Sequence, residues 1–423
     1  MLKLVEKIFT VAMLFYTTGA VLPQLIGAGS GLSRVEGNPL ALAVQLALYS
    51  AAFVFIVLGW RSFLHWTWGA RWIVALSLVA VVSVLWSQDP SFTLRRSLVL
   101  SATTAFGVYF GSRYTLVEQL RMLAWTCALV VISCFIFGFL FPKYGIDHVV
   151  HPGDWQGAFI QKNSLARAMV FSVFVFYFVR PTSFAWLRWV GVAASLSLLL
   201  LSKSVTGIVV LAIAASALPF FHLVRKRLSI LVPLGVVTAL LVIGAAAFLA
   251  AYGRDLLLLL HRSPTLTDRT ELWQAVLMSI SKRPWGGYGF NAFWMGMQGE
   301  SAAVMVRVGW FPKHAHNGFL DLLLDLGILG LCTFLVGYLS LWSKTLRLLR
   351  SAAGHYPVWL CIYMVFMFIY NLTESSILVQ NNLFWLLYVS AASTLAALFP
   401  QKSLSSQGVS QYEFQFHSYC LQG

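Results

Sequence analysis

Residues 313–331 read KHAHNGFLDLLLDLGILGL, a stretch that joins a polar segment with two histidines to a long apolar run. The longest polar interval of the chain, residues 253–311, precedes it. The apolar run 319–341 is long enough to cross a bilayer at about 20 residues per span. Asp321 and Asp325 lie inside that run. A carboxylate near the bilayer centre costs at least ~2.5 kcal/mol, so these acids are expected to be functional or paired inside a bundle.

The composition indicates a polytopic membrane protein. Of 423 residues, 59% are hydrophobic and only 10% are charged, and the apolar residues come in runs separated by short polar connectors. The first run, residues 8–27, is too long for the apolar part of a signal peptide, so it is expected to be the first span. The five cysteines lie in apolar runs or the tail and suggest neither disulfides nor zinc. The net charge of +15 is scattered without a basic arm, so nucleic-acid binding is not predicted.

About twelve membrane spans are predicted, so the expected fold class is all-α, a polytopic bundle of transmembrane helices. Their approximate ranges are 8–27, 40–59, 72–87, 97–112, 122–141, 164–179, 188–203, 206–222, 229–252, 316–341, 357–374 and 382–399. The rule for basic residues applies to short connectors and excludes the long 253–315 loop. With the N-terminus inside, fifteen Lys and Arg residues then lie inside and seven outside. Both termini are therefore expected in the cytoplasm and the long loop in the periplasm.

These spans divide the chain into four parts. Residues 1–252 hold nine predicted membrane helices, and residues 253–315 form the large periplasmic loop. Residues 316–399 hold three further helices. Residues 400–423 form a polar cytoplasmic tail that is expected to be disordered.

The long loop is expected to contain an amphipathic helix over residues 268–282. Apolar residues follow helical spacing at Leu272, Trp273, Val276, Leu277 and Ile280. Asp268 and Glu271 have capping-box spacing, and Pro284 marks the exit. Arg269 would then occupy the first helical position, where the helix dipole disfavours a cation. Either an anion binds beside it at the free N–H groups, or the arginine is simply solvated.

Basic residues near the outer face of the predicted bundle suit a substrate that carries phosphate. Arg95 and Arg96 precede the fourth span, Lys162 and Asn163 precede the sixth, and Lys203 lies between the seventh and eighth. Each of them, taken alone, is equally well explained by anchoring at the membrane interface. A lipid-linked sugar diphosphate would use them together, because cations stabilise the charge that grows on a leaving diphosphate.

The acceptor hydroxyl of such a transfer needs a base, and His316 is the candidate because it begins a span and is followed by Asn317. A helix-start histidine at the water boundary is the plainer alternative. A metal site at His314-x-His316 or His148-x-x-His151 lacks a zincin pattern or nearby cysteines.

The pattern His-Asn-x9-Gly-x-x-Gly, formed by His316, Asn317, Gly327 and Gly330, resembles the signature of the O-antigen ligase and polymerase superfamily. Four other segments resemble its exopolysaccharide polymerase branch, the ExoQ-like and Wzy-like proteins. They are WSQDPSFTLRRS (86–97), WQGAFIQKNSLAR (155–167), TLTDRTELW (265–273) and RPWGGYGFNAFW (283–294).

The resemblance implies an inverting glycosyltransferase of the membrane GT-C type that needs neither metal nor cofactor. Its substrate would be an oligosaccharide on undecaprenyl diphosphate at the periplasmic face of the bacterial inner membrane. It also implies that His316 is the general base and Arg269 the diphosphate-binding arginine. Lys203 stands where ligases more usually have arginine, and a lysine lacks the bidentate fork.

We therefore expect His316, Arg269 and Lys203 to be catalytic. Seven further residues are expected to bind substrate, namely Arg95, Arg96, Lys162, Asn163, Arg254, Asn317 and Glu374. Glu374 lies at the end of the eleventh span, a place where an acid is most often a solvated cap. Expected partners are the lipid-linked oligosaccharide, membrane lipids, and the chain-length regulator and flippase of the same pathway.

Three functions stay open at this point. The first is a polymerase that joins lipid-linked repeat units, and the nearest alternative is a ligase that moves a finished glycan onto a lipid A core. A flippase or transporter, with Asp321 and Asp325 as a proton relay, belongs to a different class.

Overall fold

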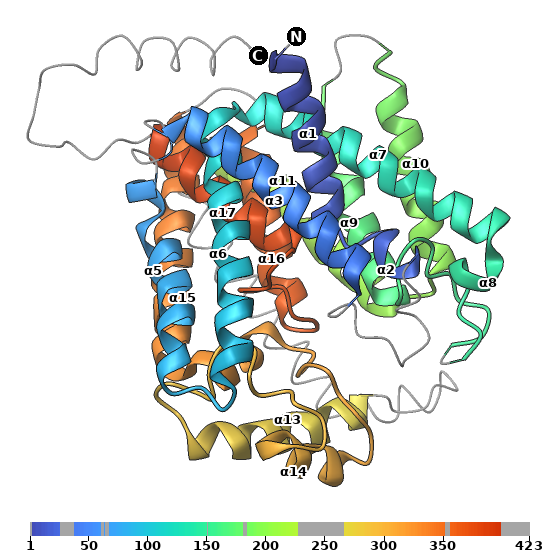
Figure 1. The fold of residues 1–423 in the computed structure, drawn as a ribbon. Helices are drawn as coiled ribbons and strands as arrows, with labels where there is room; N and C mark the ends of the chain where they lie inside the picture. Colours follow the sequence, from blue (N-terminus) through green and yellow to red (C-terminus); the bar gives the residue numbers. More distant parts are fainter. Residues whose placement is uncertain are drawn as a thin grey trace, which may run out of the picture.

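The computed structural model describes residues 2–25, 38–60, 63, 67–149, 151–180, 184–226, 266–351 and 356–398. These residues form helices and no β-strand, apart from an isolated bridge between Ile146 and Trp155. The helices, shown in Figure 1, are α1 (Leu2–Thr17), α2 (Leu22–Leu25), α3 (Pro39–Leu58), η2 (Trp68–Ala70), α5 (Arg71–Val82), η3 (Ser83–Leu85), α6 (Pro90–Arg113), α7 (Leu116–Leu140), α8 (Pro142–Gly145), α9 (Lys162–Phe178), α10 (Leu187–Leu201), α11 (Val205–Lys226), α13 (Leu266–Lys282), α14 (Gly299–Val308), α15 (Gly318–Ser351), α16 (Tyr356–Asn371) and α17 (Leu383–Leu398).

Several helices are suited to a membrane. Four described helices, α3, α7, α11 and α15, are long and apolar enough to cross one, and shorter apolar helices include α5, α10, α16 and α17. On α7, Leu129, Ile132, Ile136 and Phe139 follow one helical face and are exposed. Such a stripe is expected where a helix faces lipid rather than water. The prediction of an all-α membrane protein is confirmed.

Helices occupy each predicted span except 229–252, which lies outside the described residues. The first span was wrong in extent, because α1 ends at Thr17 and Gly19 then turns the chain with φ +73°. Helix α1 also begins earlier than predicted, at Leu2. Near this start, the carboxylate of Glu6 pairs with Arg113 at 2.6 Å, so a charged residue is accommodated inside the helix. The fourth span was also predicted too short. Helix α6 begins at Pro90, where the side chain of Asp89 caps it.

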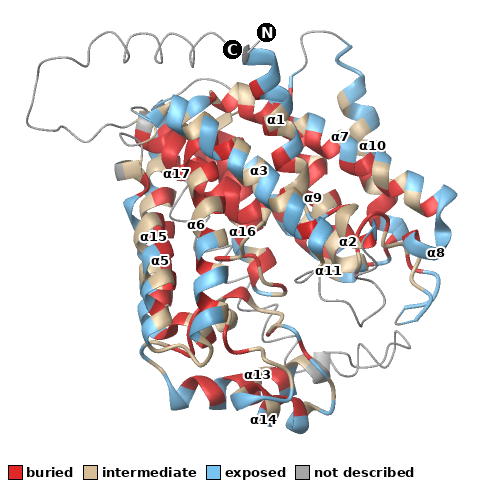
Figure 2. Cartoon of the chain, viewed as in Figure 1, coloured by how far each residue is buried: buried red, intermediate tan, exposed pale blue. Residues whose placement is uncertain are grey.

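The centre of the bundle is formed by α16 and α17, where buried positions concentrate (Figure 2). Helix α17 lies along α6, and α16 lies against α11 and α15. Close approach of α6 and α17 depends on glycine. A Cβ at Gly111 would stand 2.3 Å from the carbonyl oxygen of Ser390. Large rings such as Trp385 and Tyr388 fill the space that remains.

Helices α13 and α14 lie together at one end of the bundle, next to the ends of α5, α6 and α15 (Figure 1). The predicted amphipathic helix is confirmed as α13, and its buried face includes Leu272, Val276 and Ile280. Two details were wrong. The helix begins at Leu266, so Arg269 is its fourth residue, and Leu277 is exposed because it lies off the buried face. The predicted cap at Asp268 concerns a side chain outside the described residues.

Helix α15 is broken at Gly327, which has φ +62° and ψ −158°. The segment 284–289 fills the break with backbone hydrogen bonds. They run from Ile328 N to Pro284 O (2.8 Å), Leu329 N to Trp285 O (3.2 Å), Tyr288 N to Leu324 O (2.7 Å) and Gly289 N to Asp325 O (3.0 Å). A Cβ at Gly327 would lie 2.4 Å from the carbonyl carbon of Trp285, so both the close contact and the positive φ require glycine.

The break also relocates the two acids of α15. Asp321 and Asp325 were predicted to lie inside one continuous span, but they precede Gly327, where α15 packs against α13. The carboxylate of Asp321 accepts hydrogen bonds from Trp294 Nε1 (2.9 Å), from the backbone N–H of Ala315 (2.9 Å) and from the hydroxyl of Ser375. Asp321 therefore ties the segment before α15 to the loops around it.

Candidate functional site

The carboxylate of Glu374 connects three of the predicted site residues. Its Oε2 lies 3.3 Å from Nδ1 of His316. Its Oε1 lies 3.4 Å from a guanidinium nitrogen of Arg269 and accepts a hydrogen bond from Nδ2 of Asn163 at 3.1 Å. Only 7% of Glu374 is exposed, so it is a buried hub and not the solvated cap that is usual after a span. We call these four residues the Glu374 cluster.

Ionisation of Glu374 follows from its neighbours. Burial raises the pKa of its carboxyl, but the hydrogen bond with His316 and the charges of His314 and Arg269 outweigh burial and lower the pKa to about 2. The carboxylate is therefore charged at neutral pH. Burial is also the main cause that lowers the pKa of His314, followed by the nearby charge of His316.

Arg269 is held in place by two groups from the segment after α16. One guanidinium nitrogen donates to the carbonyl oxygen of Thr373 at 3.0 Å, and another approaches Glu374. The sequence left open whether an anion or solvent accompanies Arg269. Within the described residues its partner is the carboxylate of Glu374, and the side chain is 24% exposed.

His316 stands just before α15 with a left-handed backbone, φ +50°. Its backbone N–H donates to Nδ1 of His314 at 3.1 Å, and Trp273 on α13 donates from Nε1 to the carbonyl of Ala315 at 2.9 Å. Asn317 caps α15, since its Oδ1 accepts from the backbone N–H groups at positions 319 and 320. The cap explains an asparagine here, and substrate binding by Asn317 stays a prediction.

A second cluster, the Asp154 cluster, holds the two predicted lysines. Asp154 Oδ2 lies 2.7 Å from Nζ of Lys162, and its Oδ1 lies 3.1 Å from Nζ of Lys203. Burial raises the pKa of Asp154, but the hydrogen bonds from the two lysines lower this pKa by a larger amount, so the net shift is downward. Ser204 connects the two clusters. It follows Lys203 of the Asp154 cluster in the chain, and its hydroxyl donates to Oδ1 of Asn163 in the Glu374 cluster at 3.1 Å.

Two of the three residues predicted to be catalytic have left-handed backbones. Lys203 and His316 both have φ +50°, a region that L-residues other than Asn, Asp and His adopt infrequently. Such strain persists only where the surroundings enforce it, and it is found preferentially at functional sites. Lys203 is such a residue, whereas a histidine such as His316 adopts this region more readily.

Other predicted residues are not part of these clusters. Arg95 and Arg96 were predicted in a connector, but they lie in the first turns of α6, where their guanidinium groups lie 6.0 and 4.9 Å from the ring of Phe92. Among the described residues, the polar contacts of Glu374 do not include either arginine. The turn before α6 instead contacts the 284–289 segment, through Trp86 Nε1 and the carbonyl of Gly286 at 2.8 Å. Arg254 lies outside the described residues.

The structure adds residues that sequence reasoning did not select. Asp154 directly precedes the segment 155–167 that resembles the polymerase branch, and that position was a usable signal. Tyr370 and Ser204 carry no comparable signal. Tyr370 lies in the apolar helix α16, yet its hydroxyl donates to the carbonyl oxygen of Asn163 at 3.2 Å.

The ligand atoms of His314, His316 and Glu374 lie within 4.8 Å of one another, so by type and number they could hold a metal ion. Two contacts oppose a cation here. Arg269 already places positive charge on the same carboxylate, and Nδ1 of His314 accepts the N–H of His316. Three fixed cations surround two acids across the Glu374 and Asp154 clusters, which favours an anionic ligand.

Fold and site together define an all-α membrane protein with a polar, cation-rich site at the junction of α9, α13, α15 and α16. A family model described as O-antigen ligase matches residues 190–335, which include Lys203, Arg269 and His316. The resemblance to the O-antigen ligase and ExoQ-like superfamily is confirmed by this match and by two relatives.

The exopolysaccharide production protein ExoQ of Rhizobium meliloti (strain 1021) is 25% identical over 330 residues, which cover 72% of each chain. The putative polysaccharide ligase RP358 of Rickettsia prowazekii (strain Madrid E) is 29% identical over 121 residues. That second match covers 27% of this chain and 30% of the ligase, so it concerns one part of each protein.

Proposed function

We propose that this protein is an integral-membrane glycosyltransferase that polymerises oligosaccharide repeat units carried on a lipid diphosphate. The observation that carries the proposal is the shared carboxylate of Glu374, which holds His316 and Arg269 in one site. A base for an acceptor hydroxyl and a cation for a leaving diphosphate are thereby neighbours. The similarity to a protein named for exopolysaccharide production supports this substrate class.

The proposed reaction is a single displacement at the anomeric carbon. The acceptor oxygen forms a bond to that carbon while the bond to the diphosphate oxygen breaks, and the electron pair leaves with the diphosphate. His316 takes the hydroxyl proton, and Nε2 is the nitrogen that acts because Nδ1 faces Glu374. Arg269, with Lys203 and Lys162, binds the diphosphate and stabilises its growing charge. One displacement inverts the anomeric configuration, and the side chains supply the cationic charge without a metal.

The remaining parts of the proposal concern placement. We propose about twelve spans in a GT-C-like bundle in the bacterial inner membrane, with both termini in the cytoplasm and the parts 1–252, 253–315, 316–399 and 400–423 as predicted. Arg95, Arg96, Arg254 and Asn317 are kept as candidate substrate contacts. The chain-length regulator and the flippase of the same pathway are the proposed partners.

A ligase is the second candidate, favoured by the description of the matching family and by the name of the second relative. It would use the same site with a lipid A core as acceptor. The flippase alternative needs Asp321 and Asp325 as a proton relay. Three hydrogen bonds to Asp321 from loops and backbone support a structural role for it instead.

The test is substitution in the native host. His316→Ala and Arg269→Ala are each expected to abolish polymer while the protein is inserted at normal levels and the single repeat unit accumulates on lipid. His148→Ala is the matched control, because this histidine is exposed and, among the described residues, its ring forms a hydrogen bond with the backbone carbonyl of Pro142. Normal polymer length in either site variant would refute the proposal. Transfer of labelled glycan onto lipid A core, without chain growth, would identify the ligase.

A further inference from the structure

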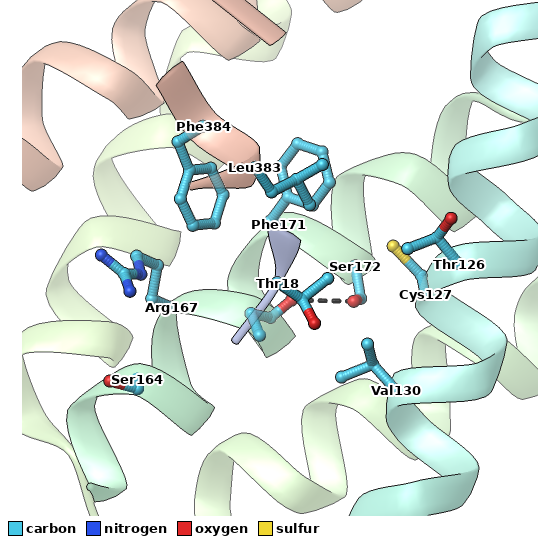
Figure 3. A pocket seen from close by; sticks show the side chains of 11 residues that line it. Thr18, Thr126, Cys127, Val130, Ser164, Arg167, Phe171, Ser172, Leu383 and Phe384 are labelled. Carbon is cyan, nitrogen blue, oxygen red and sulfur yellow. Dashed lines mark hydrogen bonds between the residues drawn. The ribbon is translucent and has the colours of Figure 1, made fainter. Parts of the chain in front are cut away.

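A pocket beside the Glu374 cluster lies between α7, α9 and the start of α17 (Figure 3). Its walls are apolar at Val130, Phe171 and Leu383 and carry hydroxyl groups at Ser164 and Ser172. The charged side chain among its lining residues is Arg167, which forms one side of the pocket near Phe384 (Figure 3). The pocket therefore combines an apolar wall with one fixed cation.

The guanidinium of Arg167 is held by rings. It lies 5.2 Å from the ring centroid of Tyr370 and 5.0 Å from that of Phe384. Rings stabilise a cation electrostatically, but they leave the N–H donors of the guanidinium without acceptors. Within the described residues, no carboxylate pairs with Arg167 and no oxygen accepts from it.

This lack of a counter-charge distinguishes Arg167 from the other cations nearby. Arg269 has Glu374, and Lys162 and Lys203 share Asp154. A half-buried guanidinium among apolar side chains is costly, and a charged group in such a place is by default a functional site. An anion supplied by a ligand would remove that cost.

Arg167 lies close to the Glu374 cluster. It follows Asn163 by four residues on α9, which is one helical turn, or about 6 Å of rise. Tyr370 connects the two positions, because its hydroxyl bonds the backbone of Asn163 while its ring faces Arg167. A ligand on Arg269 could therefore extend along α9 to Arg167 and its apolar pocket.

We infer that Arg167 is a further binding residue for a phosphate group attached to a lipid chain, with the apolar pocket wall next to that lipid. The guanidinium fork matches two phosphate oxygens. The inference rests on the proposed function, which supplies the lipid diphosphate as the most direct ligand. The same chemistry is offered by the headgroup of an anionic phospholipid.

The test measures binding without turnover, in nanodiscs, with the His316→Ala protein. Arg167→Met removes the charge and keeps a long apolar stem, and Arg167→Lys keeps the charge without the fork. Arg188→Met is the matched control, because Arg188 also lies over a ring, that of Trp189, at 4.9 Å. It is separated from Lys203 by the length of α10, about 20 Å.

Arg167→Met is expected to raise the Kd for purified lipid-linked diphosphate at least about tenfold, equivalent to about 1.4 kcal/mol. The Kd of Arg167→Lys should lie between those of Arg167→Met and the His316→Ala parent. The Kd of Arg188→Met should equal that of the parent. Equal melting temperatures would show that all the variants are folded. Native mass spectrometry in phosphatidylglycerol nanodiscs forms the second arm. Loss of bound phosphatidylglycerol with an unchanged donor Kd would assign the site to a phospholipid.

Unchanged binding of both ligands by Arg167→Met would overturn the inference. The proposed function is judged separately, because it fails when His316→Ala protein still polymerises, whatever its donor affinity. A tenfold higher donor Kd for Arg167→Met, measured in a His316→Ala protein that does not polymerise, would support both the role of Arg167 and the proposed function.

Discussion

The imidazole Nδ1 of His316 and Oε2 of Glu374 lie 3.3 Å apart, although 58 positions separate the two residues in the chain. A carboxylate on one ring nitrogen fixes the tautomer and the orientation of the ring, and it stabilises the imidazolium that forms when the other nitrogen accepts a proton. Glu374 is therefore placed to position the proposed base. Its second oxygen faces Arg269, so one buried acid aligns both halves of the proposed chemistry.

Glu374→Gln tests this positioning. Glutamine keeps the shape of the side chain but removes the charge, so we expect kcat to fall by roughly 10 to 100-fold, part of the ~10² to 10⁴ that a general base contributes. Glu374→Asp, which keeps the charge, should recover part of that loss. A kcat equal to that of the wild type in Glu374→Gln would contradict the role.

The pH dependence of stability provides a second prediction. The pKa of Glu374 is lowered from its ordinary 4.5 to about 2, so the folded state favours the charged form. Its contribution is fully present above pH 4.5 and is lost as the pH falls toward 2. The shift corresponds to roughly 3 kcal/mol. The wild type should therefore lose about that much unfolding free energy relative to Glu374→Gln between pH 5 and 2, measured by denaturant titration in detergent. A constant difference across this range would exclude the coupling.

Arg269→Lys separates charge from geometry. The guanidinium reaches both the carbonyl of Thr373 and the carboxylate of Glu374, and an ammonium group lacks the fork to do both. We expect KM for the lipid-linked donor to rise about tenfold, since hydrogen bonds to charged groups contribute ~1.5 to 3 kcal/mol. Arg307→Lys, at an exposed position of α14, is the control and should leave KM unchanged. A KM equal to wild type in Arg269→Lys would show that charge alone suffices.

Gly327→Ala tests the break in α15. The new Cβ would lie 2.4 Å from the backbone of Trp285, at a residue with φ +62°. Gly296 is a matched control because its φ is +70° and no atom lies within 4 Å of its Cβ position. The left-handed backbone destabilises both variants. The clash should lower the unfolding free energy of Gly327→Ala by roughly 1 to 3 kcal/mol more than that of Gly296→Ala. Thermal unfolding in detergent measures the difference, and equal destabilisation would show that the 284–289 segment yields without cost.

Local patterns in the sequence predicted much of the fold. Apolar runs of span length predicted the helices of the bundle, and the spacing of Leu272, Val276 and Ile280 predicted α13. Helix ends were less accurate, because α1 and α6 begin where side chains of Glu6 and Asp89 find partners that hydropathy does not encode.

The sequence alone determined that the chain is an all-α membrane protein, and its His-Asn-x9-Gly-x-x-Gly pattern marked His316. These are properties of neighbours along the chain. Tertiary structure decided that Glu374 and Asp154 gather the cations. It also decided that, within the part of the chain that the structure describes, the polar contacts of Glu374 include neither Arg95 nor Arg96 and no carboxylate pairs with Arg167. The physical reason is that these contacts join residues as many as 211 positions apart, so they depend on how the helices pack and not on any local pattern.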